Sequence, residues 1–296
     1  MESKGRNKAI FEVIPLTERD CLYVADRSKS EFTYPMHSHR ACELNFTQNA
    51  NGVKRTVGDS VEEIGDYDLV LIANGKLEHV WEQHNCICDK AREITVHFRP
   101  DLVMGNFVNK LQFESIRRML QKAECGIAFP MSAILKVYHM LDTLSSEKSG
   151  FYMVMKFFAI LYELSQCEQM RVLSSYSLKT KSTSEDKRIA DIQDYISKNY
   201  MTDIRLPNLA KMAGMSPVAF SRLFKQKIGK SLSDYIIDMR LGYASRFLLD
   251  STNSISDISY ECGFNNLSNF NRIFKKKKNC SPKEFRETFR KRKRVV

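Results

Sequence analysis

Hydrophobic and polar residues alternate in short runs over the first hundred positions, and Gly, Asn and Asp separate the runs. Within 93–98, Ile94, Val96 and Phe98 alternate with Thr95 and His97, which is the period of a half-buried strand. Strands at roughly ten-residue spacing predict a small β-barrel or β-sandwich. The candidate strands are 11–14, 22–25, 43–47, 53–57, 69–73 and 93–98.

Beyond Pro100 the apolar residues recur at helical spacing, around 111–120 and 134–141. The segment 151–170 is apolar over much of its circumference. A helix of this kind needs more than one surface to pack against, so both a buried position within the chain and a dimer interface stay open.

The last third of the chain contains an internal repeat. Residues 209–216 align with 258–265 at a shift of 49, and 220–225 align with 270–275 at a shift of 50. Each copy has the order helix, short Gly-containing turn, helix, which predicts two helix-turn-helix motifs. Gly214 and Gly263 fall where the first helix of each copy must end in a left-handed residue.

Capping residues support this assignment. Ser216 before Pro217 predicts the start of one second helix, and Asn265 or Asn266 the start of the other, while Ser254 caps the helix before it. One face of each second helix carries core residues, namely Phe220, Leu223 and Phe224, and Phe270, Ile273 and Phe274. The opposite faces are left for base edges in a DNA major groove; they carry Val218, Ser221, Arg222 and Lys225 in the first copy, and Leu267, Ser268, Asn271, Arg272 and Lys275 in the second.

A long helical pattern over 231–249 joins the two copies. Nineteen residues at 1.5 Å per residue make a rod of about 28 Å. Successive major grooves on one face of duplex DNA lie about 34 Å apart. The rod therefore sets a spacing suited to two groove contacts.

The charge distribution points to the same partner. The 296 residues include 46 Lys and Arg and 35 Asp and Glu, a formal charge of +11. Residues 181–296 hold 24 basic and 12 acidic residues, a net of +12, which leaves −1 for residues 1–180. Two domains of different purpose follow, and the second suits double-stranded DNA.

Other features exclude classes of protein. No apolar run is long enough to span a bilayer, and the polar first eight residues lead into no secretory signal, so we expect a cytoplasmic protein with no membrane partner. The eight cysteines show no repeated pairing and are expected to be free thiols. The motifs GxSxG, Walker A and GxGxxG are absent in a usable context, so we expect no enzyme.

Residues 187–289 resemble the DNA-binding domain of the AraC/XylS family of bacterial transcription regulators. The resemblance rests on Leu209-Ala210, Gly214-Met215-Ser216, the two Phe-x-Arg-x-Phe-Lys-type blocks, Gly229-Lys230-Ser231, Arg240-Leu241, Gly263-Phe264 and Ser281-Pro282. It implies an all-α domain with two helix-turn-helix motifs joined by a long helix. Ser259 and Asn279 depart from the residues usual in the family, which predicts a less rigid second motif.

The order His37-x-His39-x3-Glu43, followed by His79, resembles the motifs of cupin barrels. The two resemblances together imply an α+β protein whose cupin-like barrel, followed by helices, binds an effector and dimerises. A small polar effector, for example a sugar, would contact His37, His39, Glu43, His79 and Trp81. We expect no cofactor; a divalent metal on the three histidines and Glu43 is the alternative.

These features give a domain plan and a ranking of functions. We expect an effector domain at 1–172, a Ser/Thr-rich linker at 173–186 and the DNA-binding domain at 187–296. A transcription regulator, acting as a homodimer through helices in 130–170 and with RNA polymerase as a further candidate partner, ranks first. A metal or redox sensor that uses the histidines or Cys86 and Cys88 ranks second, and a cupin metalloenzyme fused to a DNA-binding domain ranks last.

Overall fold

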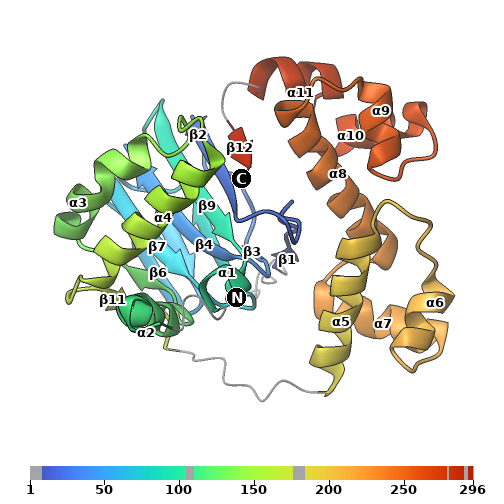
Figure 1. The fold of residues 1–296 in the computed structure, drawn as a ribbon, viewed down its shortest axis with the longest axis horizontal. Coiled ribbons are helices and arrows are strands. Elements are labelled where there is room, and N and C mark those ends of the chain that lie inside the picture. The colour runs from blue at the N-terminus through green and yellow to red at the C-terminus, as the bar shows by residue number, and fades with distance from the viewer. Residues whose placement is uncertain (1–8, 105–109, 176–183, 279, 290–292, 296) are drawn as a thin grey trace, which may run out of the picture. The chain divides into compact units, whose positions relative to one another are not determined.

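The computed structural model describes residues 9–104, 110–175, 184–278, 280–289 and 293–295. Most of the expected linker (176–183), Asn279 and part of the basic tail (290–292) lie outside the described residues. Internal contacts divide the chain into two compact units, coloured in chain order in Figure 1. One comprises Met1–Glu12, Glu18–Leu178 and Arg294–Val296, and the other Val13–Thr17 and Lys179–Lys293. The first is rich in β-strands and the second is helical, which confirms the mixed α+β class.

The first unit is built on two sheets. Among the described residues, one sheet has the strand order β1-β3-β8-β5-β6 and the other the order β11-β10-β7-β4-β9-β2-β12. The strands are β1 (Ile10–Phe11), β2 (Leu22–Lys29), β3 (His37–Ser38), β4 (Cys42–Gln48), β5 (Lys54–Val57), β6 (Ser60–Glu63), β7 (Tyr67–Ile72), β8 (His79–Glu82), β9 (Ala91–Phe98), β10 (Ile127–Ala128), β11 (Arg171–Val172) and β12 (Lys293–Val295). The expected strand at 11–14 is wrong beyond Phe11, and the short strands β3, β6 and β8 were not predicted.

Helices cover one face of the larger sheet (Figure 1). Their apolar sides pack with the outward residues of the sheet, such as Leu44, Val96 and Phe98, into one core. The helices are α1 (Pro100–Met104), α2 (Glu114–Ala123), α3 (Met131–Asp142) and α4 (Gly150–Ser165), with a 3-10 turn at Leu111–Phe113. Since α4 buries Phe157 and Leu161 but exposes Phe151 and Tyr162, only part of its apolar circumference is used within the chain.

The opposite face of the same sheet is polar and is buried too. In β9 every residue from Glu93 to Phe98 is buried, so the expectation of a half-buried strand is wrong. The reason is the pairing of β4 with β9, which sets Glu43 opposite His97 and Asn45 opposite Thr95 inside the unit. Polar residues on this face therefore contact one another and not solvent.

The second unit contains two helix pairs on either side of a long helix. Its helices are α5 (Ser184–Asn199), α6 (Leu206–Met212), α7 (Pro217–Ile228), α8 (Leu232–Asp250), α9 (Ile255–Glu261), α10 (Leu267–Lys278) and α11 (Pro282–Phe289). The segment Val13–Thr17 belongs to this unit, where the Tyr243 hydroxyl donates to the Leu16 carbonyl at 3.2 Å. The described residues contain no helix long and apolar enough to cross a membrane.

The predicted capping residues act at the starts of three helices of the second unit. Ser216 accepts a hydrogen bond from the Ala219 amide at 3.3 Å, and Ser254 accepts one from the Asp257 amide at 3.0 Å. Asn266, one of the two candidates for the second copy, accepts from the Asn269 amide at 3.0 Å. These bonds satisfy first-turn amides that have no partner within the helix.

Candidate functional site: the histidine cluster and the two second helices

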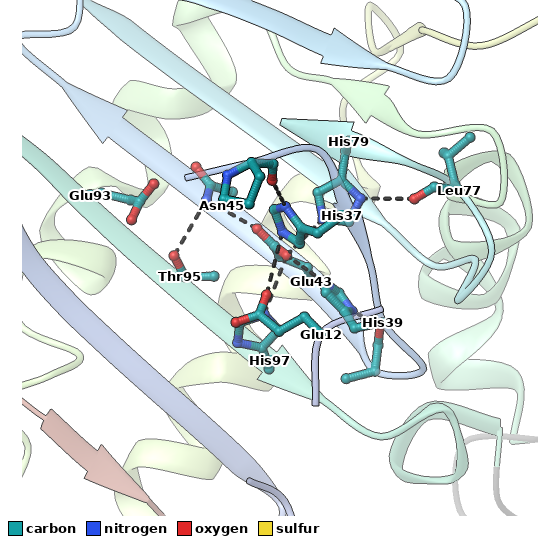
Figure 2. Close-up of polar contacts among 12 residues, drawn as sticks. Glu12, His37, His39, Glu43, Asn45, Leu77, His79, Glu93, Thr95 and His97 are labelled. Atoms are coloured by element: carbon teal, nitrogen blue, oxygen red, sulfur yellow. Dashed lines mark hydrogen bonds and ion pairs between the residues drawn. The ribbon is translucent and has the colours of Figure 1, made fainter. Parts of the chain in front are cut away.

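Polar side chains on β3, β4, β8 and β9, and on the residue directly after β3, converge inside the first unit (Figure 2). We name His37, His39, Glu43, His79 and His97 the histidine cluster; each of them is at most 7% exposed. The Nε2 atom of His39 lies 2.6 Å from Glu43 Oε2, and those of His79 and His97 each lie 3.3 Å from the same oxygen. One carboxylate oxygen is thus the common contact of three imidazoles.

A second carboxylate reaches the cluster from the N-terminal segment. His37 Nε2 lies 3.5 Å from Glu12 Oε2. Glu12 directly follows the short strand β1, which pairs with β3, the strand that carries His37. The other oxygen of Glu43 accepts a hydrogen bond from the Asn45 amide at 3.0 Å. Four ligand atoms, one each from His37, His39, Glu43 and His79, lie within 4.8 Å of one another.

The pKa values of Glu43 and His37 are both lowered, but by different causes. Burial by itself raises the pKa of Glu43, but the imidazoles of His39, His79 and His97 outweigh it and hold that pKa well below its usual range. Burial, with a smaller contribution from His79, lowers the pKa of His37 to about 4. At neutral pH the cluster therefore contains a carboxylate at Glu43 and a neutral imidazole at His37.

The sequence located part of this cluster. It named His37, His39, Glu43 and His79 together, and the structure brings them together, whereas it did not name His97 or Glu12. Trp81, also named, is buried with its ring centroid 6.1 Å from that of His79, and its indole N–H donates to Asp68 at 3.2 Å.

A separate polar cleft lies outside the cluster. It has a volume of about 330 Å³, and Arg55, Glu62, Asp68 and Arg171 contribute charged groups to its lining. Arg55 pairs with Asp68 and with Glu62, and Arg171 also pairs with Glu62. These four charges pair with one another, and the fifth charged residue of the lining, Glu63, lies 3.6 Å from His84 Nε2.

The second helices α7 and α10 present the faces that the repeat predicts. Phe220, Phe224, Phe270 and Phe274 are buried, and Ile273 is half-buried. On the opposite faces eight of the nine predicted residues are exposed: Val218, Ser221, Arg222, Lys225, Ser268, Asn271, Arg272 and Lys275. Leu267 is half-buried at the start of α10.

The two helices differ in charge and in local restraint. The basic residues of α7 are Arg222, Lys225 and Lys227, whereas α10 has Arg272 and four consecutive lysines, 275–278. Arg272 donates to the Asn269 side chain at 2.9 Å, which restrains it along the helix. Neither helix contains an acidic residue.

Known proteins are similar to this chain in the region that contains α7 and α10. A family profile described as a helix-turn-helix domain matches residues 209–288. An uncharacterized HTH-type transcriptional regulator of Pseudoalteromonas carrageenovora is 37% identical over 32% of this chain and 56% of its own length. The HTH-type transcriptional activator RhaS of Yersinia pestis is 30% identical over 34% of this chain and 37% of its own length.

The matched region contains both helix-turn-helix copies and the long helix between them. It is an AraC-type DNA-binding domain.

Two further similarities extend beyond the AraC-type domain. The lactose operon transcription activator of Staphylococcus xylosus is 28% identical over 50% of this chain and 51% of its own length. The structure of ToxT from Vibrio cholerae aligns with 90% of this chain and 98% of its own, with a TM-score of 0.51 and 12% identity, which is a likeness of fold alone. The chain spans between 37% and 56% of the lengths of the curated relatives named here.

Within the AraC-type domain, the departure at Ser259 is accommodated. Its side chain is fully buried, and its hydroxyl donates to the Ser256 carbonyl at 2.8 Å, so the added polar atom has a partner. The Ser259 hydroxyl therefore leaves no unpaired polar atom in this core, and the lower rigidity of the second motif stays a prediction.

Proposed function

We propose that the protein is a sequence-specific transcription regulator that reads duplex DNA with α7 and α10. The observation that carries this proposal is the repeated exposed face, at equivalent positions of the two helices, opposite a buried aromatic core. A solvated face on one helix needs no partner. Here two such faces occur, with Arg222 and Arg272 at equivalent positions of the repeat, and the domain has a net positive charge. Together these features favour a repeated target such as successive major grooves.

The long helix supports two simultaneous contacts. With 19 residues, α8 makes a rod of about 28 Å, comparable with the spacing of about 34 Å between successive major grooves. Lys230 and Lys277, from the two halves of the unit, both pair with Asp238 on α8, at 2.7 and 3.0 Å. These pairs help to hold the two halves on one rigid element.

For the rest of the chain we propose a cupin-like effector unit at 1–172, a linker at 173–186 and a reader at 187–296. Exposed apolar side chains on α3 and α4 support dimerisation: Leu135, Phe151 and Tyr152 are 66%, 67% and 63% exposed. Large apolar side chains that two packed helices leave exposed are typical of an interface. We propose a small polar effector, RNA polymerase as a further partner and no catalysed reaction, in keeping with relatives that are named as regulators.

A gel-shift assay tests DNA reading. The full chain is titrated against the promoter regions that flank its gene and against shuffled DNA of the same length and composition. We expect preference for a native fragment, and loss of that preference in Arg222→Ala and Arg272→Ala. Arg188→Ala, which removes an exposed charge from α5, is the matched control and is expected to behave as the parent. Equal binding to all DNAs, unchanged by either variant, contradicts the proposal.

Light scattering tests dimerisation. The parent is expected to have the mass of a dimer, and Leu135→Asp with Phe151→Asp is expected to shift it to a monomer without loss of helix content. Val61→Asp, at a residue 60% exposed on β6, is the control. A parent that is monomeric at high micromolar concentration, both free and on DNA, contradicts this part of the proposal.

A further inference from the structure

The second helices α7 and α10 differ at the position three residues before each paired arginine. At the shift of 50 that relates the two helices, Arg272 corresponds to Arg222, and Asn269 corresponds to Ala219. Residues three apart on an α-helix lie one turn apart on the same side, so their side chains can meet. Asn269 therefore offers Arg272 a hydrogen-bond acceptor, whereas the methyl group of Ala219 offers none to Arg222.

In α10 this contact is formed. Arg272 Nη2 donates to Asn269 Oδ1 at 2.9 Å, and both residues are exposed. Because water competes for a hydrogen bond between exposed side chains, the bond adds little to the stability of the fold. Its main consequence is the orientation of the guanidinium, since a long and flexible side chain is tied to a short one.

Asn269 is itself well fixed. Its backbone amide donates to Asn266 Oδ1 at 3.0 Å, and the next residue, Phe270, is fully buried in the core of the second unit. Two hydrogen bonds in series thus connect the start of α10 to the guanidinium of Arg272, through Asn269. The position of the arginine head is therefore referred to the helix end and the aromatic core.

The first copy has only the first of these two bonds. Ser216, which corresponds to Asn266 at the same shift of 50, accepts from the Ala219 amide at 3.3 Å. Phe220 is fully buried, as Phe270 is. The series ends at Ala219, so the preceding turn of α7 does not orient Arg222. The two copies therefore make an internal comparison in which one acceptor is present or absent.

The bond to Asn269 leaves Arg272 able to read a base. A guanidinium has more N–H donors than a bidentate contact with guanine O6 and N7 uses, so Arg272 can make that contact and keep Asn269 as a partner. An arginine that is already oriented also loses less conformational freedom when it contacts DNA. When the base is changed, a held guanidinium cannot turn to another acceptor, whereas a mobile one can turn to a phosphate.

We propose that Asn269 is a positioning residue for DNA reading. It holds Arg272 so that Arg272 discriminates between base pairs more sharply than Arg222 does, and the first copy lacks this support. The inference deepens the proposed function and rests on it, because it assigns a cause to the specificity of one of the two helices.

A measurement on the free protein tests the orientation without DNA. The ¹⁵N relaxation of the arginine Nε–H groups is recorded for the full chain, and Arg222→Ala and Arg272→Ala assign the two signals. We expect a higher order parameter at Arg272 than at Arg222, and loss of that difference in Asn269→Ala. The result does not depend on the success or failure of DNA reading.

A second measurement tests discrimination. A preferred duplex is selected from a random library, and anisotropy then compares it with duplexes that change one base pair at a time. The base pair at which Arg272→Ala abolishes discrimination is the one that Arg272 reads. There, Asn269→Ala is expected to lower discrimination by about 2- to 10-fold, and to have no further effect in the Arg272→Ala background. Base pairs read by Arg222 should be unaffected.

Conservative and reciprocal variants separate positioning from folding. Asn269→Asp keeps the acceptor and should keep discrimination, although its charge weakens binding to all duplexes alike. Ala219→Asn supplies the missing acceptor at an exposed position and should raise discrimination at the base pair that Arg222 reads by a similar factor. Asn208→Ala, which removes an exposed asparagine from α6, is the matched control, and its discrimination should equal that of the parent.

Three results overturn the inference. The first is an equal order parameter at Arg222 and Arg272 in the free parent, and the second is unchanged discrimination at the Arg272 base pair in Asn269→Ala. The third is a loss that persists in the Arg272→Ala background, since Asn269 would then contact DNA itself. A parent that prefers no duplex is a different result, which contradicts DNA reading and removes the role of Asn269 with it.

Discussion

The two helix-turn-helix copies share a sequence pattern, but their turns are packed differently. Both turn glycines are left-handed, with φ of 66° at Gly214 and 81° at Gly263. A methyl group at Gly214 would meet open space, whereas one at Gly263 would lie 2.8 Å from the Tyr200 carbonyl oxygen and 2.9 Å from that of Met201. Glycine is thus required in the first copy by backbone conformation, and in the second by conformation and close packing.

Arg240 explains why the second turn is enclosed. Its side chain on α8 donates to the carbonyls of Tyr200 and Thr202, each at 2.8 Å, and so fixes the segment that covers Gly263. Tyr200 also stacks on Tyr243 of α8, with ring centroids 4.0 Å apart. The second motif is therefore fixed to the long helix through its turn, while the turn of the first is open.

The largest expected effect contrasts the two glycines. Gly263→Ala should lower the free energy of unfolding by about 2–5 kcal/mol, because strain and overlap add, and Gly214→Ala by about 1–2 kcal/mol from strain alone. Urea unfolding of the full chain, followed by far-UV circular dichroism, measures this. The fluorescence of Trp81, the single tryptophan and part of the first unit, is the internal control. Equal losses at the two sites contradict the packing difference.

The next effect concerns the paired arginines. Arg222→Ala and Arg272→Ala should each weaken binding to a preferred DNA by about 1–3 kcal/mol, which is about 5- to 150-fold, if each contacts a base. Since Arg272 is restrained by Asn269, we expect the larger loss there. Fluorescence anisotropy at fixed salt measures the DNA affinity of both variants. If a variant loses affinity equally for preferred and random DNA, its arginine contacts phosphate and not a base.

Two serine helix caps, one in each copy but on different helices of the motif, provide a smaller effect. Ser216→Ala and Ser254→Ala should each destabilise the second unit by about 1 kcal/mol, because each removes one acceptor from a first-turn amide. The shorter bond at Ser254, 3.0 Å against 3.3 Å, predicts the larger loss in the second copy. Substitution by Thr at either site, which keeps the hydroxyl, should restore most of the stability.

Removing lysines from the two second helices should have the smallest effect on DNA affinity at any one salt concentration. We expect it to show mainly in how steeply the affinity falls as salt is raised. Replacing Lys275 and Lys276 by Ala should reduce the slope of log affinity against log salt by about 0.9 for each lost phosphate contact. The equivalent change at Lys225 and Lys227 should do less, since Lys227 lies 3.8 Å from Glu185. Slopes that fall equally would indicate that the lysine run of α10 adds no contact of its own.

The sequence predicted the second unit better than the first, for a physical reason. Its signals are local: a left-handed glycine, a capping serine and a buried aromatic lie within one turn of the helix end that they define. Repetition then marked the faces of α7 and α10, because the aromatic core residues recur at equivalent positions.

In the first unit the site depends on strand pairing. The spacing of His37, His39 and Glu43 lies in one segment and could be recognised. His97 is 54 residues beyond Glu43 and meets it only through the register of β4 against β9. A shift of one residue would turn His97 to the other face, so no local pattern identifies it as part of the cluster. Glu12 depends in the same way on β1 pairing with the two-residue strand β3.

Selection of bound sequences from a random duplex library tests the central claim most directly. The parent chain should enrich two blocks of bases about 10 base pairs apart, one for each second helix. Arg222→Ala should degrade one block and leave the other, and Arg272→Ala should do the reverse. A single enriched block, or the same block lost in both variants, would contradict the claim that both helices read DNA.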